Sequence, residues 1–162
     1  MYRCPACKVN PKSHSFDHIA NAPNGMRIFY TAPALSEELD GPTKARNMKF
    51  HLDDARTTKW VWVIDCSKME SKHSSSLEFI RYIADVLHRE HAGILQHLIV
   101  LNSNTWVRWV ASVARTFVDS EVLKCLVFSH NIFEDLQKLN MPTSVIHAVL
   151  VRNQSLSSLV QQ

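Results

Sequence analysis

The chain has 162 residues, of which 46% are hydrophobic, 20% are charged and three are glycine, and its formal net charge is +3 at pH 7. This length suits a single domain with one hydrophobic core, and the composition excludes disordered and collagen-like proteins. So small a positive charge gives no reason to expect a nucleic-acid partner, although it is compatible with weak attraction to an anionic membrane surface.

The sequence contains no stretch of about 18 apolar residues, as a transmembrane helix requires, and its amino terminus lacks the apolar segment of a signal peptide. We therefore expect a cytoplasmic protein that meets membranes only peripherally, at their surface. In that reducing compartment the four cysteines are not expected to form disulfides.

Residues 1–25 are rich in Pro, Asn, His and Ser and show no period, which predicts an irregular segment. Within it Cys4, Cys7, His14 and His18 follow the pattern C-x2-C-x6-H-x3-H. Two thiolates and two imidazoles suit tetrahedral zinc, although the middle spacing is shorter than in common zinc fingers. The segment is therefore a candidate structural zinc site. The alternatives are an exposed segment without a ligand and, less favoured because a redox C-x-x-C normally opens a helix after a strand, a redox pair.

Residues 26–150 alternate between strand and helix patterns. Runs rich in β-branched and aromatic residues predict strands at 26–31, 60–65, 97–102 and 123–128. Helical spacing of apolar residues predicts helices at 43–56, 75–90, 104–118 and 131–139. Strands joined by such helices lie parallel, so the predicted class is α/β, with a mainly parallel sheet of about four to five strands and helices packed on it. Residues 151–162 contain several serines and are predicted to be a frayed tail.

The helix predicted at 104–118 is unusually aromatic. Trp106, Trp109, Val110, Val113 and Phe117 fall on one face, with arginines on the other. Burial of that face would contribute a couple of kcal/mol or more per aromatic side chain, roughly in proportion to its area, so it must meet something apolar. Ordinary core packing is one interpretation. The other is that part of the face lines a lipid cavity or turns towards a membrane, where Trp and Arg are favoured.

No strong signature of catalysis is present. Asp65, Cys66, His73, Asn102 and His130 lie near predicted strand ends, where a Cys-His nucleophilic site would have to form. The sequence has neither a G-x-S-x-G elbow nor a glycine-rich phosphate loop, and it has no H-E-x-x-H. We therefore expect a protein that is not an enzyme and has no organic cofactor.

Lys124 interrupts the otherwise apolar strand predicted at 123–128. Its side chain can point outward at a sheet edge. Alternatively, it can meet an anionic lipid headgroup inside a cavity, where its charge would be little screened.

Several of these segments resemble a known family when they are taken in order. WVWVIDCSKM, LIVLNSNTWVRWV, FVDSEVLKCLVF and NIFEDLQKL, followed by Met141-Pro142, look like successive motifs of the CRAL-TRIO lipid-binding domain. The resemblance covers roughly residues 26–142 and leaves the Cys/His segment outside it. It implies an α/β domain whose sheet forms the floor of a hydrophobic pocket, gated by the helix at 104–118.

The resemblance also implies a headgroup-binding residue, and the sequence departs from the family pattern at other positions. Lys124 stands where phosphoinositide-transferring members place a headgroup-binding Lys. Gly93 stands where those members carry a headgroup-contacting Glu, and no Gly-Gly follows Pro142. The chain is thus similar to a divergent or minimal member.

The resulting hypothesis is non-enzymatic binding or transfer of a lipid or other small hydrophobic ligand. The predicted ligand-binding residues are Trp106, Trp109, Val110, Val113, Phe117 and Lys124. The partners expected are the ligand and, transiently, a membrane surface. The alternative is a protein-protein interaction scaffold that keeps the fold but has a closed pocket.

Overall fold

The computed structural model describes residues 4–38 and 43–159 of the chain. In these residues five strands form one sheet, with the strands in sequence order. They are β1 (Asp17–Asn21), β2 (Arg27–Thr31), β3 (Trp60–Asp65), β4 (Leu95–Leu101) and β5 (Leu126–Ser129). The edge strand β1 is antiparallel to β2, and the other pairs are parallel. The predicted α/β class with a mainly parallel sheet is confirmed.

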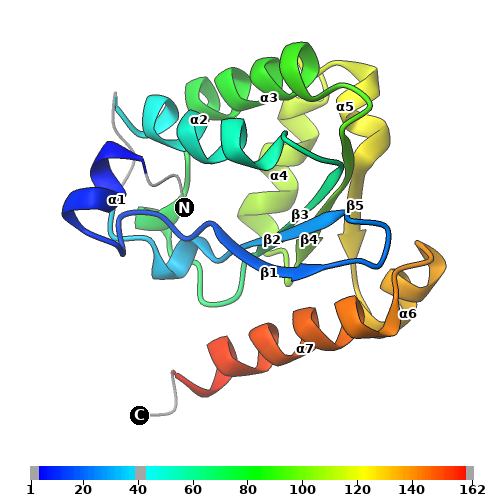
Figure 1. The fold of residues 1–162 in the computed structure, drawn as a ribbon. Coiled ribbons are helices and arrows are strands. Elements are labelled where there is room, and N and C mark those ends of the chain that lie inside the picture. The colour runs from blue at the N-terminus through cyan, green and yellow to red at the C-terminus, as the bar shows by residue number, and fades with distance from the viewer. Residues whose placement is uncertain (1–3, 39–42, 160–162) are drawn as a thin grey trace.

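The helices cover both faces of this sheet (Figure 1). They are α1 (Pro5–Val9), α2 (Lys44–Ala55), α3 (Leu77–His91), α4 (Thr105–Ala114), α5 (Ser120–Cys125), α6 (Ile132–Lys138) and α7 (Thr143–Ser158). Parallel strands that follow one another across a sheet through right-handed crossovers place their connecting helices on the same face. Accordingly, α2 to α5 lie on one face of the sheet and α7 lies on the other.

The two faces carry separate hydrophobic cores because successive side chains of a strand point to opposite sides. On the central strand β3, Trp60 and Trp62 pack with α2 and α3, whereas Val61 and Val63 pack with α6 and α7. All four side chains are buried. Burial of each such side chain contributes about 1.5–3 kcal/mol, so β3 anchors both layers to the sheet.

The amino-terminal segment is more regular than its composition predicts. The backbone N–H of Cys7 donates to the sulfur of Cys4 at the start of α1, at 3.3 Å. β1 pairs with β2 across a turn in which Gly25 has a φ of 83°. β1 is a short, polar edge strand and therefore shows no alternating hydrophobic pattern. Backbone pairing with β2, together with partial burial of Ile19 and Ala20 against the core, holds it in place, which corrects the prediction of an irregular segment.

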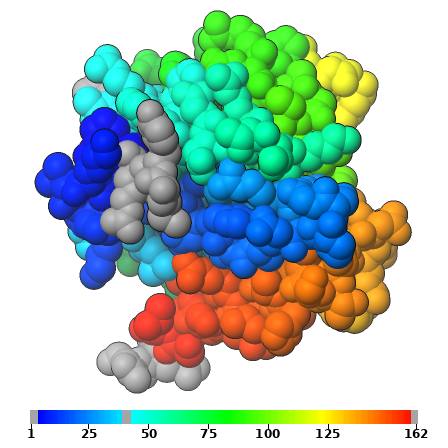
Figure 2. All heavy atoms as spheres, in the orientation of Figure 1, coloured from blue at the N-terminus to red at the C-terminus, as the bar shows by residue number. Residues whose placement is uncertain are grey.

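The prediction of a frayed tail from residue 151 is wrong as far as Ser158, because helix α7 continues through the serine-rich residues to that position. Val149 and Leu156 are buried against the sheet, while the serines between and after them point outward. Figure 2 shows α7 packed along the β1 edge of the molecule. The apolar side chains on the second face of the sheet must be buried, and α7 packs over them although the apolar pattern of α7 itself is weak. Residues 160–162 of the predicted tail lie outside the described residues.

Two element boundaries near the aromatic helix also differ from the predicted ones. α4 ends at Ala114 rather than at residue 118, and a second helix, α5, precedes β5. Asp119 caps α5 by accepting from the backbone N–H of Glu121 at 2.8 Å. The strand predicted at 123–128 therefore begins only at Leu126, because local capping keeps the preceding residues helical.

Candidate functional site

An apolar cavity of about 280 Å³ lies between the sheet and the helices α2 to α5. Its floor is the face of the parallel strands that these helices cover, and α3 and α4 form its walls. The floor includes Trp62, Ile64, Leu98, Val100 and Phe128, and the walls include Ile80, Ile83, Leu87, Val107, Val110 and Ala111. These floor and wall side chains are hydrophobic, so the part of the cavity that they enclose suits hydrocarbon.

A second hollow, of about 610 Å³, lies outside α3 beside residues 117–119. It is larger by volume, but four of its nine lining residues are charged, namely Glu78, Arg81, Asp85 and Asp119. A ligand pocket is usually apolar with a few convergent polar groups. The apolar cavity is therefore the candidate site.

α4 turns a slightly different face to the cavity than its sequence indicates. Trp106 and Val110 line the cavity, whereas Trp109 and Val113 do not border it. Phe117 lies beyond the end of the helix, and its ring packs under the guanidinium of Arg81 at 4.7 Å. Val107, Ala111 and Ala114 complete the lining. The inward-facing set is therefore shifted by about one residue along the helix from the predicted set.

Lys124 does not reach the cavity. It lies in the last turn of α5, exposed, and forms an ion pair with Glu121 one turn earlier. This surface pair also raises the pKa of the Lys124 ammonium. The predicted role of Lys124 as a headgroup contact inside the cavity is therefore corrected, because the residues expected to form a strand are helical.

A different lysine borders the cavity. Lys44, at the start of α2, is buried, and its Nζ donates to Ser75 Oγ at 3.2 Å and lies 5.0 Å from the ring centroid of Phe79. Ser36, Glu38, Lys72 and His73 also border the cavity. The sequence carried no signal for this polar group, because its members come from three separate segments, residues 36–38, 44 and 72–75, that only the fold brings together.

Cys66 borders the cavity from the end of β3. Burial, with a smaller contribution from the neighbouring Asp65 carboxylate, raises the pKa of its thiol to about 12. A protonated thiol is a weak nucleophile, so Cys66 contributes apolar surface to the cavity rather than an activated nucleophile.

Asp65, the residue before Cys66, is fully buried but does not line the cavity. Its carboxylate accepts hydrogen bonds from Tyr30 Oη, from Asn102 Nδ2 at 3.0 Å and from Asn153 Nδ2 at 3.0 Å. Burial raises the pKa of Asp65, but the hydrogen bonds from Asn102, Ser67 and Tyr30 outweigh it, and the net shift is downward. These donors come from β2, the loop after β4 and α7, so the carboxylate joins α7 to the sheet and to that loop.

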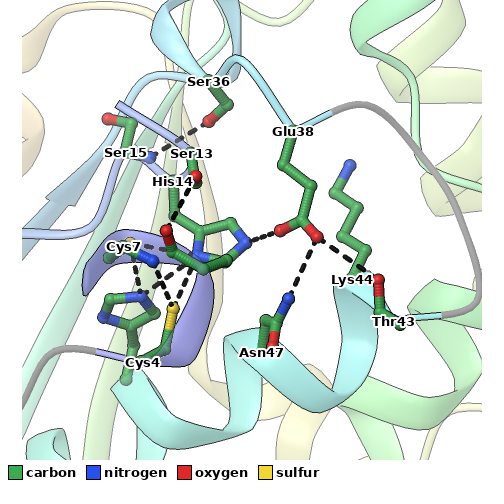
Figure 3. A network of polar contacts seen from close by, with 12 residues as sticks. Cys4, Cys7, Ser13, His14, Ser15, Ser36, Glu38, Thr43, Lys44 and Asn47 are labelled. Atoms are coloured by element: carbon green, nitrogen blue, oxygen red, sulfur yellow. Dashed lines mark hydrogen bonds and ion pairs between the residues drawn. The ribbon is translucent and has the colours of Figure 1, made fainter. Parts of the chain in front are cut away.

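A separate cluster of cysteine and histidine side chains could hold a metal ion (Figure 3). Cys4, Cys7, His14 and His51 place their ligand atoms within 4.8 Å of one another. His51 comes from α2 and occupies the place for which the sequence indicated His18. The His18 ring instead lies exposed on β1, with its Nε2 3.0 Å from the carbonyl oxygen of Ala20.

Burial is the main influence on the pKa values of Cys7 and His51 in this cluster. Burial is the largest cause that raises the pKa of the Cys7 thiol to about 11. Burial and then the neighbouring His14 lower the pKa of His51 to about 4. The imidazole of His51 is thus neutral at pH 7, which is the form that binds metals.

The described helices include none that is both long enough and apolar enough to cross a membrane. A single mostly parallel sheet, helices on both of its faces and an apolar cavity on one of them define an α/β domain. The family model of the CRAL/TRIO domain matches residues 44–147, which is more than half of the chain. The chain belongs to the CRAL/TRIO domain family, and the predicted family resemblance is confirmed.

Comparison with solved structures supports the same fold. A structure described as the crystal structure of Sfh5 is similar, with a TM-score of 0.52 at 13% sequence identity. The match covers 71% of this chain and 47% of that one, so the present chain spans about half the length of this relative. A sequence comparison with curated proteins gave no match.

Proposed function

We propose that this protein binds, and passes between membranes, a lipid or other small hydrophobic molecule held in the cavity between the sheet and α2 to α5. The cavity is the observation that carries the proposal, and membership of the CRAL/TRIO family supports it. Its volume of about 280 Å³ lies near the lower end of ligand pockets, which occupy about 300–1,000 Å³. A single acyl chain or a compact hydrophobic molecule fits this size better than a lipid with two full chains.

The polar end of the cavity gives the ligand an orientation. Lys44 and Ser75 lie at this end, and Lys72 and His73 border it. The other walls are apolar. We therefore place the hydrocarbon part of the ligand against Val110 and the sheet, and a polar or acidic group near Lys44, where water is largely excluded and charge interactions are strong.

An open cavity favours this function over the scaffold alternative, in which the side chains of the protein would fill the space. The test is native mass spectrometry of protein purified from cells, followed by uptake of a fluorescent fatty acid. We expect a co-purifying lipid or saturable uptake at one site per chain. Protein that is empty after purification and also fails to take up the probe would overturn the proposal and leave the scaffold as the better interpretation.

The outer surface of α4 supports transient membrane contact. Trp106 and Trp109 stack, with ring centroids 5.0 Å apart, and they are 45% and 50% exposed. Trp106 also lines the cavity, so the stack lies where a ligand would enter or leave. Aromatic side chains of this kind favour the membrane interface.

Trp109→Ala is expected to weaken binding to vesicles by about tenfold, the equivalent of ~1.4 kcal/mol, because it removes an interfacial indole. Co-sedimentation with phosphatidylcholine vesicles containing phosphatidylserine measures the effect. Phe133→Ala is the matched control, since Phe133 is similarly exposed, at 47%, but lies on α6. Trp109 does not line the cavity, so the uptake of soluble ligand should stay unchanged. Equal losses in the two variants would contradict an entry surface on α4.

A further inference from the structure

The cysteine–histidine cluster joins segments that are distant in the sequence. Cys4 precedes α1 and Cys7 lies within it, His14 lies in the loop before β1, and His51 lies on α2. Cys4, Cys7 and His14 are buried. Buried polar groups are normally hydrogen-bonded to suitable partners, so the contacts inside the cluster need a chemical explanation.

The contacts of one nitrogen atom cannot all be hydrogen bonds. His14 Nδ1 lies 3.3 Å from Cys4 Sγ, 3.4 Å from Cys7 Sγ and 3.1 Å from His51 Nε2. An imidazole nitrogen has either one proton or one lone pair, so it can satisfy one of these three neighbours. A cation at the centre of the four ligand atoms satisfies all of them at once.

Four of the six distances between these ligand atoms are close to those around a tetrahedral zinc ion, and all six are within 4.8 Å. Zinc binds imidazole nitrogen at about 2.0–2.1 Å and thiolate sulfur at about 2.3 Å, which places tetrahedral ligand atoms roughly 3.3–3.8 Å apart. The distances around His14 Nδ1 are 3.1–3.4 Å, and Cys7 Sγ lies 3.5 Å from His51 Nε2. Two thiolates with two imidazoles in this geometry favour zinc over the harder divalent ions.

The other nitrogen of His14 is held by a carboxylate. Its Nε2 contacts the Glu38 carboxylate, whose other oxygen accepts from Asn47 Nδ2 at 3.0 Å (Figure 3). A proton on Nε2 leaves the lone pair on Nδ1, which points at the cluster. Metal-binding histidines almost always have such an outer partner, which fixes the tautomer and the ring orientation.

We propose that Cys4, Cys7, His14 and His51 bind one Zn²⁺ ion and that Glu38 orients His14 towards it. All four tetrahedral positions are taken by protein, as in structural zinc sites. The ion ties α1 and the loop before β1 to α2. α1 has five residues and is too short to be stable alone. The four ligands do not line the cavity. Zinc occupancy of the site can therefore be measured without any lipid.

The decisive comparison is between two histidine variants. Elemental analysis of protein purified with zinc in the medium should give about one zinc per chain for the wild type and for His18→Ala, and almost none for His51→Ala. A Cys4→Ser, Cys7→Ser double variant should also lose the metal. Loss of zinc in His18→Ala with full retention in His51→Ala would overturn the proposed ligand set. Wild-type protein without metal would overturn the site itself.

Two further measurements keep the test valid if His51→Ala does not fold. Cobalt substituted into the wild type should show the absorption of a tetrahedral ion with thiolate ligands, and an octahedral spectrum would contradict the proposal. Glu38→Gln should lower zinc affinity by about 10- to 100-fold in competition with a chelator. Glu37→Gln is its control, because the Glu37 carboxylate accepts from Asn10 Nδ2 at 2.6 Å and does not contact the cluster. Equal affinities of the two variants would contradict the role of Glu38.

Discussion

Ala111→Phe is expected to reduce ligand uptake by at least about tenfold, or ~1.4 kcal/mol of binding free energy. Ala111 lies on α4 and lines the cavity. A phenyl ring at this position would occupy much of the space of about 280 Å³, and the ligand would have to displace it. Titration with a fluorescent fatty acid measures the loss.

The same substitution is not expected to destabilise the fold. Filling a cavity commonly stabilises a protein by about 0.5–2 kcal/mol, provided that no side chain is forced out of its rotamer. Ser112→Phe is the matched control, since it adds the same ring to the same helix at an exposed position that does not line the cavity. Normal uptake by Ala111→Phe, with an unchanged melting temperature, would show that the ligand binds elsewhere.

Asp65→Ala is expected to lower the free energy of unfolding by about 3 kcal/mol. The variant leaves the buried Tyr30 hydroxyl without its acceptor, at a cost of about 1–3 kcal/mol, and Asn153 loses its acceptor as well. For a chain of this size the melting temperature should fall by roughly 6–12 °C. Asp85→Ala serves as control because that aspartate is exposed and forms an ion pair with Arg89 one turn later; such surface changes cost about 0.5 kcal/mol or less.

The contribution of Asp65 should also depend on pH. Its pKa is lowered in the folded protein, so the unfolded chain binds the proton more readily. The stabilisation is therefore fully present above about pH 4, the usual carboxyl pKa, and is lost as the pH falls through the lower folded-state pKa. Chemical unfolding of the wild type and of Asp65→Asn should converge in this acid range. A difference that stays constant down to acid unfolding would contradict a charged Asp65 in the folded state.

Strong local patterns predicted the strands and helices at the centre of the chain. The apolar run of β3 and the regular spacing in α3 depend on side chains that face the core of any such sheet. Edge elements were predicted less well. β1 is held by backbone pairing, and α7 is amphipathic only weakly, so neither leaves a clear hydrophobic period in the sequence.

The candidate sites show a similar division. Trp106 and Val110 were predicted to meet a ligand and do line the cavity, because helical spacing fixes which residues share a face. Lys44 was missed and Lys124 was misplaced, since proximity to a cavity depends on how separate segments pack. In the Cys/His cluster the sequence indicated three members that lie within one short segment. The fourth, His51, is 37 residues beyond His14, too far for any local pattern to connect them.

The amino-acid sequence was sufficient to predict the α/β class, the family and the kinds of side chain available for a ligand and for a metal. These follow from hydrophobic periodicity, from motif order and from the chemistry of each residue type. Three outcomes came from the folded chain alone: which face of α4 looks inward, that Lys44 rather than Lys124 borders the cavity, and that His51 completes the cluster. Those three outcomes depend on helix rotation and on contacts between distant segments, which are set by packing against the sheet.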